Sequence, residues 1–207
     1  MSVTKCLFLC LGLAFLPPPA HAQATLEYLP PNLQKIGDLR PTFYWVALET
    51  HDGETKNNRL LDVNGGTLAN VSNAFLAKLR MEGTGKLLDG RIINFHARVG
   101  DEIRWRICPA DAPFGYGLQE YALKPFHSVA VDPNVVPIPS RIYIPAAKGA
   151  LLPDGTMHDG YFEAVDIGDA IQNQRVDVFT SYGDQSGLFE HHGFTNMTAT
   201  AVYRVVE

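Results

Sequence analysis

The sequence predicts a mainly β protein, a small barrel with one short helix. Short runs of aromatic and β-branched residues recur along the chain, and turn-forming residues separate them. The chain contains 18 glycines and 14 prolines, which favours many turns over long helices. Only one segment has the spacing of apolar residues that a helix requires. Several short strands beside a single helix are typical of a small closed sheet.

The predicted strands are short runs rich in apolar, aromatic and β-branched residues, and Arg91–Arg98 and Ile103–Ile107 alternate between apolar and polar. They are Thr42–Leu48, Arg91–Arg98, Ile103–Ile107, Val129–Val131, Arg141–Ile144, Phe162–Val165, Arg175–Thr180 and Thr198–Val206. The stretch Gln23–Leu39 contains Pro30-Pro31, so we expect an extended lead-in there. Asp52-Gly53 and Asn64-Gly65-Gly66 are turn signals around a polar loop.

The predicted helix runs from Leu68 to Met81, where apolar residues recur at helical spacing. Thr67 can cap its first turn, and Gly83 can end it. Phe75 and Met81 are interpreted as core residues of this helix.

Residues 1–22 have the build of a secretory signal peptide. Lys5 supplies a positive charge, Cys6–Leu16 is an apolar run, and Ala20-His21-Ala22 has the small-x-small form of a cleavage site. The run is too short to span a bilayer as a permanent helix. We therefore expect residues 23–207 to form a single exported domain, periplasmic or secreted, without stable membrane insertion.

Composition limits the possible partners and the means of stabilisation. Only Cys108 remains after the signal peptide is removed, so the domain has no internal disulfide and depends on its core. The formal net charge is −5 and no basic stripe occurs, which excludes nucleic acid as an expected partner.

Asp132, Asp166 and Asp177 each follow or interrupt an apolar run of β type. A carboxylate in such a run is costly to bury unless it is paired or hydrogen-bonded. A single Asp before Pro or Gly is best explained as a turn former. Three together, two of them flanking a compact turn, favour a site, because neighbouring carboxylates raise one another's pKa and a protonated acid can cleave a glycosidic bond.

These aspartates also carry a family resemblance. The motifs are Val131-Asp132-Pro133, Val165-Asp166-Ile167-Gly168 and Arg175-Val176-Asp177, with eleven residues from Asp166 to Asp177. Their order and spacing resemble the three-aspartate (3D) domain of the membrane-bound lytic transglycosylase A family. The resemblance is strongest over residues 128–193, and the segment Arg40–Tyr44 is similar to the strand that opens these domains.

The resemblance implies a six-stranded double-psi β-barrel with an inserted or N-terminal extension. It implies a monomer that binds peptidoglycan glycan strands and cleaves the β-1,4 bond between N-acetylmuramic acid and N-acetylglucosamine, with no metal and no cofactor. Asp177 would be the general acid and base, and Asp166 would tune it. Thr42 and Tyr44 would contact the substrate. Asp132 would either contact the substrate or have a structural role at its turn.

The chain departs from the family pattern between the two aspartates. Asp169 stands where many members have Gly, and Gln172-Asn173 stands where many have Lys-Gly. Asn173 tolerates a left-handed backbone, so we expect the turn to be kept. Asp169 is assigned to the substrate groove. The alternative is a non-catalytic barrel that binds glycan or loosens the wall, as in the expansin-like relatives of this fold.

Two other signals are set aside. His191-His192, with Glu190 and Asp184 nearby, resemble metal ligands, but adjacent histidines in a strand point to opposite faces. His191 is assigned to the substrate groove instead. Cys108 lacks the surroundings that activate a nucleophile and is expected to be buried and inert.

Overall fold

The computed structural model describes residues 29–51, 53–190 and 192–206. The predicted signal peptide lies outside the described residues. The chain divides into two units, Met1–Pro30 and Pro31–Glu207. The second unit contains every helix and strand of the described part of the chain.

The second unit is mainly β, which confirms the predicted class. Its strands are β1 (Leu33–Leu48), β2 (Asn58–Leu61), β3 (Thr67–Val71), β4 (Thr84–Lys86), β5 (Ile92–Val99), β6 (Glu102–Ile107), β7 (Ser128–Val131), β8 (Ser140–Tyr143), β9 (Tyr161–Asp166), β10 (Arg175–Tyr182) and β11 (Thr200–Val205). Its helices are α1 (Asn73–Glu82) and α2 (Gly187–Glu190), with 3-10 turns η1 (Leu118–Glu120) and η2 (Pro145–Ala147). Within the described ranges, neither α-helix is long and apolar enough to cross a membrane.

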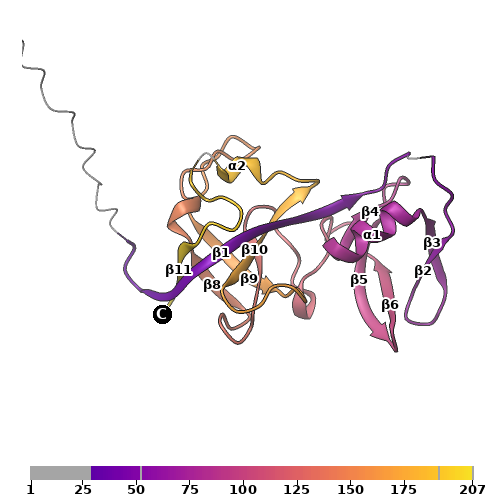
Figure 1. Cartoon of the computed structure of the whole chain (residues 1–207), viewed down its shortest axis with the longest axis horizontal. Helices are drawn as coiled ribbons and strands as arrows, with labels where there is room; N and C mark the ends of the chain where they lie inside the picture. Colours follow the sequence, from indigo (N-terminus) through magenta and orange to yellow (C-terminus); the bar gives the residue numbers. More distant parts are fainter. Residues whose placement is uncertain (1–28, 52, 191, 207) are drawn as a thin grey trace, which may run out of the picture. The chain divides into compact units, whose positions relative to one another are not determined.

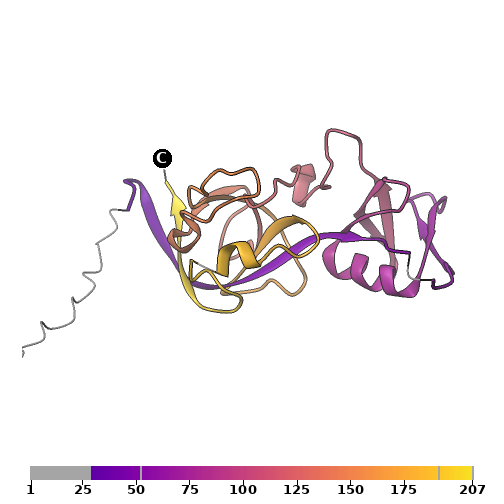
Figure 2. The same ribbon diagram turned by 90° about the horizontal axis from the view of Figure 1, so that it is seen from above.

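Strand β1 belongs to two groups of strands at once. Its first half pairs with β11, its middle pairs with β10, and its last residues, Ala47 and Leu48, pair with β4. Figures 1 and 2 show it passing from one group to the other. We predicted an extended lead-in over Gln23–Leu39. From Leu33 onward this segment is instead the first part of strand β1, because its backbone pairs with β11.

Six strands form a closed circuit of pairings in the order β10, β7, β9, β8, β11 and β1, and β1 pairs back to β10. The β1–β10 and β7–β9 pairs are parallel, whereas β7–β10, β8–β9, β8–β11 and β1–β11 are antiparallel. Strands β7, β8, β9 and β10 contribute to one apolar core, which includes Val129, Ile142, Phe162 and Val178. We call the six paired strands β1, β7, β8, β9, β10 and β11 the six-strand ring.

Beyond the ring, β1 continues into a second group made of β4, β5 and β6 with α1 and the β2–β3 hairpin. Its separate core contains Leu60, Phe75, Leu79, Ile93 and Trp105. Apolar residues from all of these elements except β4 thus bury one another, so the group has a hydrophobic centre of its own.

The predicted helix 68–81 is partly wrong. Residues Thr67–Val71 pair with β2 as strand β3, and α1 begins only at Asn73. Ser72 is the cap in place of Thr67, and its side chain accepts a hydrogen bond from the Phe75 N–H at 3.2 Å. Gly83 ends the helix with a φ of 74°, as predicted.

The core assignment of Met81 is also wrong, whereas that of Phe75 is confirmed. The inward face of α1 carries Phe75, Leu79 and Glu82. Met81 lies two residues after Leu79 and so points to the opposite side, where it is 76% exposed.

Gly85 allows α1 to approach β4, and we expect Gly85→Ala to lower the free energy of unfolding by about 1–3 kcal/mol. A Cβ at this position would lie 2.8 Å from Phe75 Cζ, 2.9 Å from Leu79 Cδ1 and 3.3 Å from Ala47 O. Urea unfolding measures the loss. Gly187→Ala is the control, because a Cβ there meets nothing within 4 Å. Equal stability of the two variants would contradict the proposed close packing.

Candidate active site

Register places the predicted acids in one row across four strands. Thr42 of β1 lies beside Asp177 of β10, Asp177 lies opposite Ala130 of β7, and Ala130 lies beside Asp166 of β9. Residues in register on neighbouring strands share a face of the sheet. The row therefore presents two carboxyl groups and one hydroxyl on the same face, with a small alanine between the two acids.

Asp177 is a buried acid with incomplete hydrogen bonding. Its Oδ1 is buried and has no hydrogen-bond partner among the described residues. Burial raises the pKa of Asp177 to about 6, although a hydrogen bond from Thr42 and the nearby Arg175 cation both act to lower it. Arg175 also donates from Nη2 to Thr42 Oγ1 at 3.3 Å. One buried oxygen of this carboxyl thus has unused hydrogen-bonding capacity.

Asp166 is held by Tyr44 and by its own strand end. The Tyr44 hydroxyl donates to Asp166 Oδ2 at 2.9 Å, and the Ile167 N–H donates to Oδ1 at 2.8 Å. Burial raises the pKa of Asp166 to about 7, the nearby Asp177 raises it further, and these two hydrogen bonds act to lower it. Tyr44 is itself buried, so its own pKa lies well above the ordinary value. The predicted residues Tyr44, Asp166, Asp177 and Thr42 are therefore brought together.

A loop before η1 packs directly on Asp166. A Cβ on Gly117 would lie 2.5 Å from Val165 O and 2.9 Å from Asp166 Cβ, so only glycine allows this approach. Phe114 of the same loop packs against Phe179 with ring centroids 5.9 Å apart. The loop thereby limits solvent around the acid, which is one cause of its burial.

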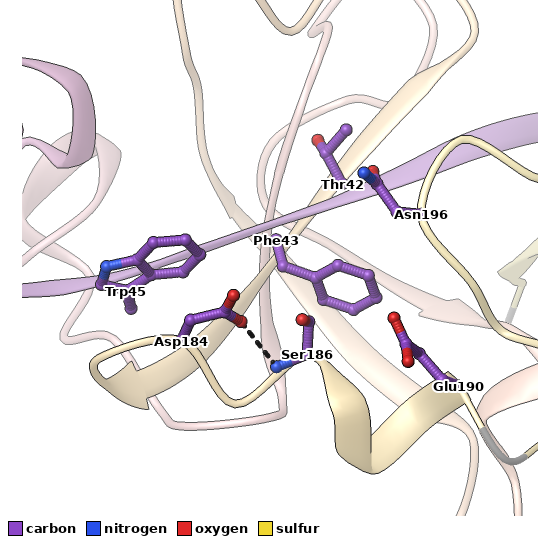
Figure 3. A pocket seen from close by; sticks show the side chains of 7 residues that line it. All are labelled: Thr42, Phe43, Trp45, Asp184, Ser186, Glu190 and Asn196. Carbon is purple, nitrogen blue, oxygen red and sulfur yellow. Dashed lines mark hydrogen bonds between the residues drawn. The ribbon is translucent and has the colours of Figure 1, made fainter.

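Thr42 is one of the residues that line a pocket of about 310 Å³. Figure 3 shows its lining, which consists of Thr42, Phe43, Trp45, Asp184, Ser186, Glu190 and Asn196. Aromatic rings from β1 stand opposite hydroxyl and carboxylate groups from the segment after β10. Such a combination suits a ligand that has both apolar faces and hydroxyl groups, as a sugar ring does.

Asp132 braces a turn. Its Oδ1 accepts hydrogen bonds from the backbone and side chain of Asn134, and its Oδ2 accepts one from the Asn173 N–H at 2.8 Å. These hydrogen bonds lower the pKa of Asp132. Asn173 has a φ of 56°, which confirms the predicted left-handed turn residue. Asp132 also lines a second hollow of about 310 Å³ at the ends of β7 and β9.

Asp169 lines the same second hollow but stands apart from the row of acids. Its side chain is 98% exposed and lies 3.4 Å from the Arg98 guanidinium of β5. His191 lies outside the described residues, so its assignment to the groove stays a prediction.

Sequence reasoning missed Glu82, the last residue of α1. Its carboxyl is buried, and Oε2 accepts a hydrogen bond from the Trp45 N–H at 3.0 Å. Burial is the main cause that raises the pKa of Glu82 to about 7; the Trp45 hydrogen bond acts to lower it, and the nearby Asp177 and Asp184 act to raise it. The available signal was an acid placed in helical register with Phe75 and Leu79, on the apolar face.

Two further groups bear on metal binding and nucleophilic chemistry. Ligand atoms of His127, His158 and Asp159 lie within 4.8 Å of one another. However, His158 Nε2 lies 2.8 Å from Phe126 O, and its Nδ1 accepts the Gly160 N–H, so it would lose a backbone contact on binding an ion.

Cys108 is buried, and burial raises its pKa to about 11, which confirms the expected unreactive thiol.

Comparison with known families agrees with the sequence motifs. Residues 127–203 match the family model of the 3D domain. These residues therefore form a 3D domain, and the fold of the chain is similar to that of solved lytic transglycosylases.

Two solved structures illustrate the likeness. The membrane-bound lytic murein transglycosylase from Agrobacterium tumefaciens aligns with a TM-score of 0.53 and 14% identity, over 82% of this chain and 74% of that one. E. coli MltA with bound chitohexaose aligns with a TM-score of 0.49 and 15% identity, over 81% of this chain and 71% of that one. No curated protein sequence matches this chain significantly. Identities this low concern the fold alone.

We expect Asp166→Asn to stabilise the protein at alkaline pH. The pKa of Asp166 is about 7, raised from 3.8, so its contribution to stability is complete below pH 3.8 and is lost as pH rises through 7. Asparagine has no charge to desolvate, and the variant should gain about 2–4 kcal/mol over the wild type between pH 4 and pH 8. Urea unfolding at both values measures this gain, with the exposed Asp38→Asn as control. A difference that does not change with pH would refute it.

Proposed function

We propose that this protein is a lytic transglycosylase, a peptidoglycan-degrading enzyme that cleaves the bond between N-acetylmuramic acid and N-acetylglucosamine. The observation that carries the proposal is the buried Asp177, whose Oδ1 has no hydrogen-bond partner among the described residues and whose pKa is raised to about 6. Thr42, which is in register with Asp177, lines the pocket. The 3D domain over residues 127–203 supports the assignment.

In the proposed reaction Asp177 acts first as an acid and then as a base. Its proton passes to the glycosidic oxygen while the bond from that oxygen to C1 of the muramic acid breaks. The 6-hydroxyl oxygen of the same sugar then attacks C1 and closes a 1,6-anhydro ring, and its proton returns to Asp177. No water is consumed, and the carboxyl ends in the state in which it began. A pKa near 6 suits both steps near neutral pH.

The neighbouring groups have distinct proposed roles. Asp166, held by Tyr44, has the higher pKa and would stay protonated beside an ionised Asp177, so the two acids do not repel each other. Thr42 orients the Asp177 carboxyl and lies at the edge of the pocket. The pocket would hold one sugar of the glycan strand against the rings of Phe43 and Trp45.

We also infer the finer fold and the location. The six-strand ring, with its parallel β1–β10 and β7–β9 pairs, would be a double-psi β-barrel, and β4–β6 with α1 would be the inserted extension. The predicted signal peptide over residues 1–22 would export a monomeric domain, residues 23–207, to the periplasm or the medium, where its substrate lies.

Asp177→Asn should abolish cleavage. The asparagine keeps the shape of the side chain but has no proton to give, so the rate should fall at least about 100-fold. The measurement is mass spectrometry of purified sacculi digested with the mature protein, in which 1,6-anhydromuropeptides are counted.

The exposed Asp38→Asn on the same strand as Thr42 is the matched control and should keep the wild-type rate. Sacculus binding by a wild-type protein that releases no anhydromuropeptide would refute the enzyme and favour the non-catalytic glycan-binding alternative. Full activity of Asp177→Asn would leave cleavage standing but remove Asp177 from its role.

A further inference from the structure

Glu82 is a buried carboxyl outside the matched 3D domain. It ends α1, and only 9% of the residue is exposed. Ionisable groups are rarely buried to this extent without a partner or a function. Phe75 and Leu79, on the same face of the helix, belong to the second apolar core, whereas Glu82 contacts β1.

The contact lies at the point where β1 changes partners. Tyr44 is in register with Phe179 of β10, but Val46 is in register with Tyr182, so the pairing shifts at Trp45. One residue after Val46, Ala47 pairs with β4. Glu82 Oε2 accepts the Trp45 N–H at this irregular position. The carboxyl therefore fixes the backbone between Tyr44, which holds Asp166, and the change to the second group of strands.

The charged and titratable groups around Glu82 come from three places. Tyr44 faces it from β1, Asp177 from β10 and Asp184 from the segment after β10. Two of these neighbours are carboxyls, so a proton on Glu82 relieves like-charge repulsion. The pKa of about 7 agrees with this placement.

We propose that Glu82 is a positioning residue of the candidate active site, which holds β1 through the Trp45 backbone and keeps its own proton beside an ionised Asp177. The inference rests on the proposed lytic transglycosylase function. Asp177 has the lower pKa of the two carboxyls and ionises first, and its charge then makes ionisation of Glu82 less favourable. Through the backbone, Glu82 sets the place of Tyr44 and therefore the hydrogen bond to Asp166.

Glu82→Gln separates the two effects, because its amide oxygen can still accept the Trp45 N–H while the charge is lost. The charge coupling is tested from the side of Asp177, because Asp177→Asn removes the charge that keeps the proton on Glu82. In that variant the carbon-13 NMR titration of the Glu82 carboxyl should shift to lower pH by roughly 0.5 unit or more. A purely structural role of Glu82 would leave its titration unmoved.

Glu82→Ala removes both effects. The Trp45 amide resonance should move, the melting temperature should fall below that of Glu82→Gln, and turnover should fall further, because the β1 backbone loses its acceptor. Asp101→Asn, at the exposed turn between β5 and β6, is the charge-matched control and should leave the Glu82 titration unchanged.

The outcomes distinguish this inference from the function on which it rests. A Glu82 titration that is identical in wild type and Asp177→Asn overturns the charge effect, whether or not the protein cleaves sacculi. Equal stability and turnover of Glu82→Ala and Glu82→Gln overturn the positioning effect. Absence of anhydromuropeptides from the wild type overturns the proposed function, and the NMR titration still decides whether the two carboxyls interact.

Discussion

The structure depends on a single strand that is shared between two groups of strands. Strand β1 extends over 16 residues and pairs with β11, β10 and β4 in turn. Because its backbone hydrogen bonds are divided in this way, the six-strand ring and the second group are joined through one continuous segment. Thr42, Tyr44 and Trp45 lie in the middle of that segment, so the candidate site is built where the strand leaves one group for the other.

This arrangement accounts for the electrostatics of the site. Asp166 and Asp177 come from the ring, and Glu82 comes from the helix of the second group. Each carboxyl has a raised pKa, and burial is the largest cause for all three. Groups brought together from elements far apart in the sequence thereby hold protons near neutral pH. A site of this kind is suited to proton transfer, and ionisation of its buried carboxyls lowers the stability of the folded protein.

Local patterns predicted a large part of the fold. Runs of apolar and β-branched residues located the strands β5 to β11, because each of these strands contributes buried residues to an apolar core. The pattern failed at residues 67–71, where apolar spacing compatible with a helix proved to belong to β3. Pairing with β2 satisfies the backbone hydrogen bonds of residues 67–71, and nothing in the local sequence identifies β2 as the partner strand. It failed again for Leu33–Leu39, whose strand character comes from β11, more than 160 residues later.

The amino-acid order alone predicted the mainly β class, the 3D domain and the two acids that flank the turn 168–173, because these features are local in the chain. Tertiary pairing decided the rest. The hydrogen bond from Tyr44 to Asp166 spans 122 positions, and Glu82 reaches the site only because α1 packs on β1. Burial, and with it each raised pKa, depends on which distant residues exclude water, and that information is absent from any short stretch of sequence.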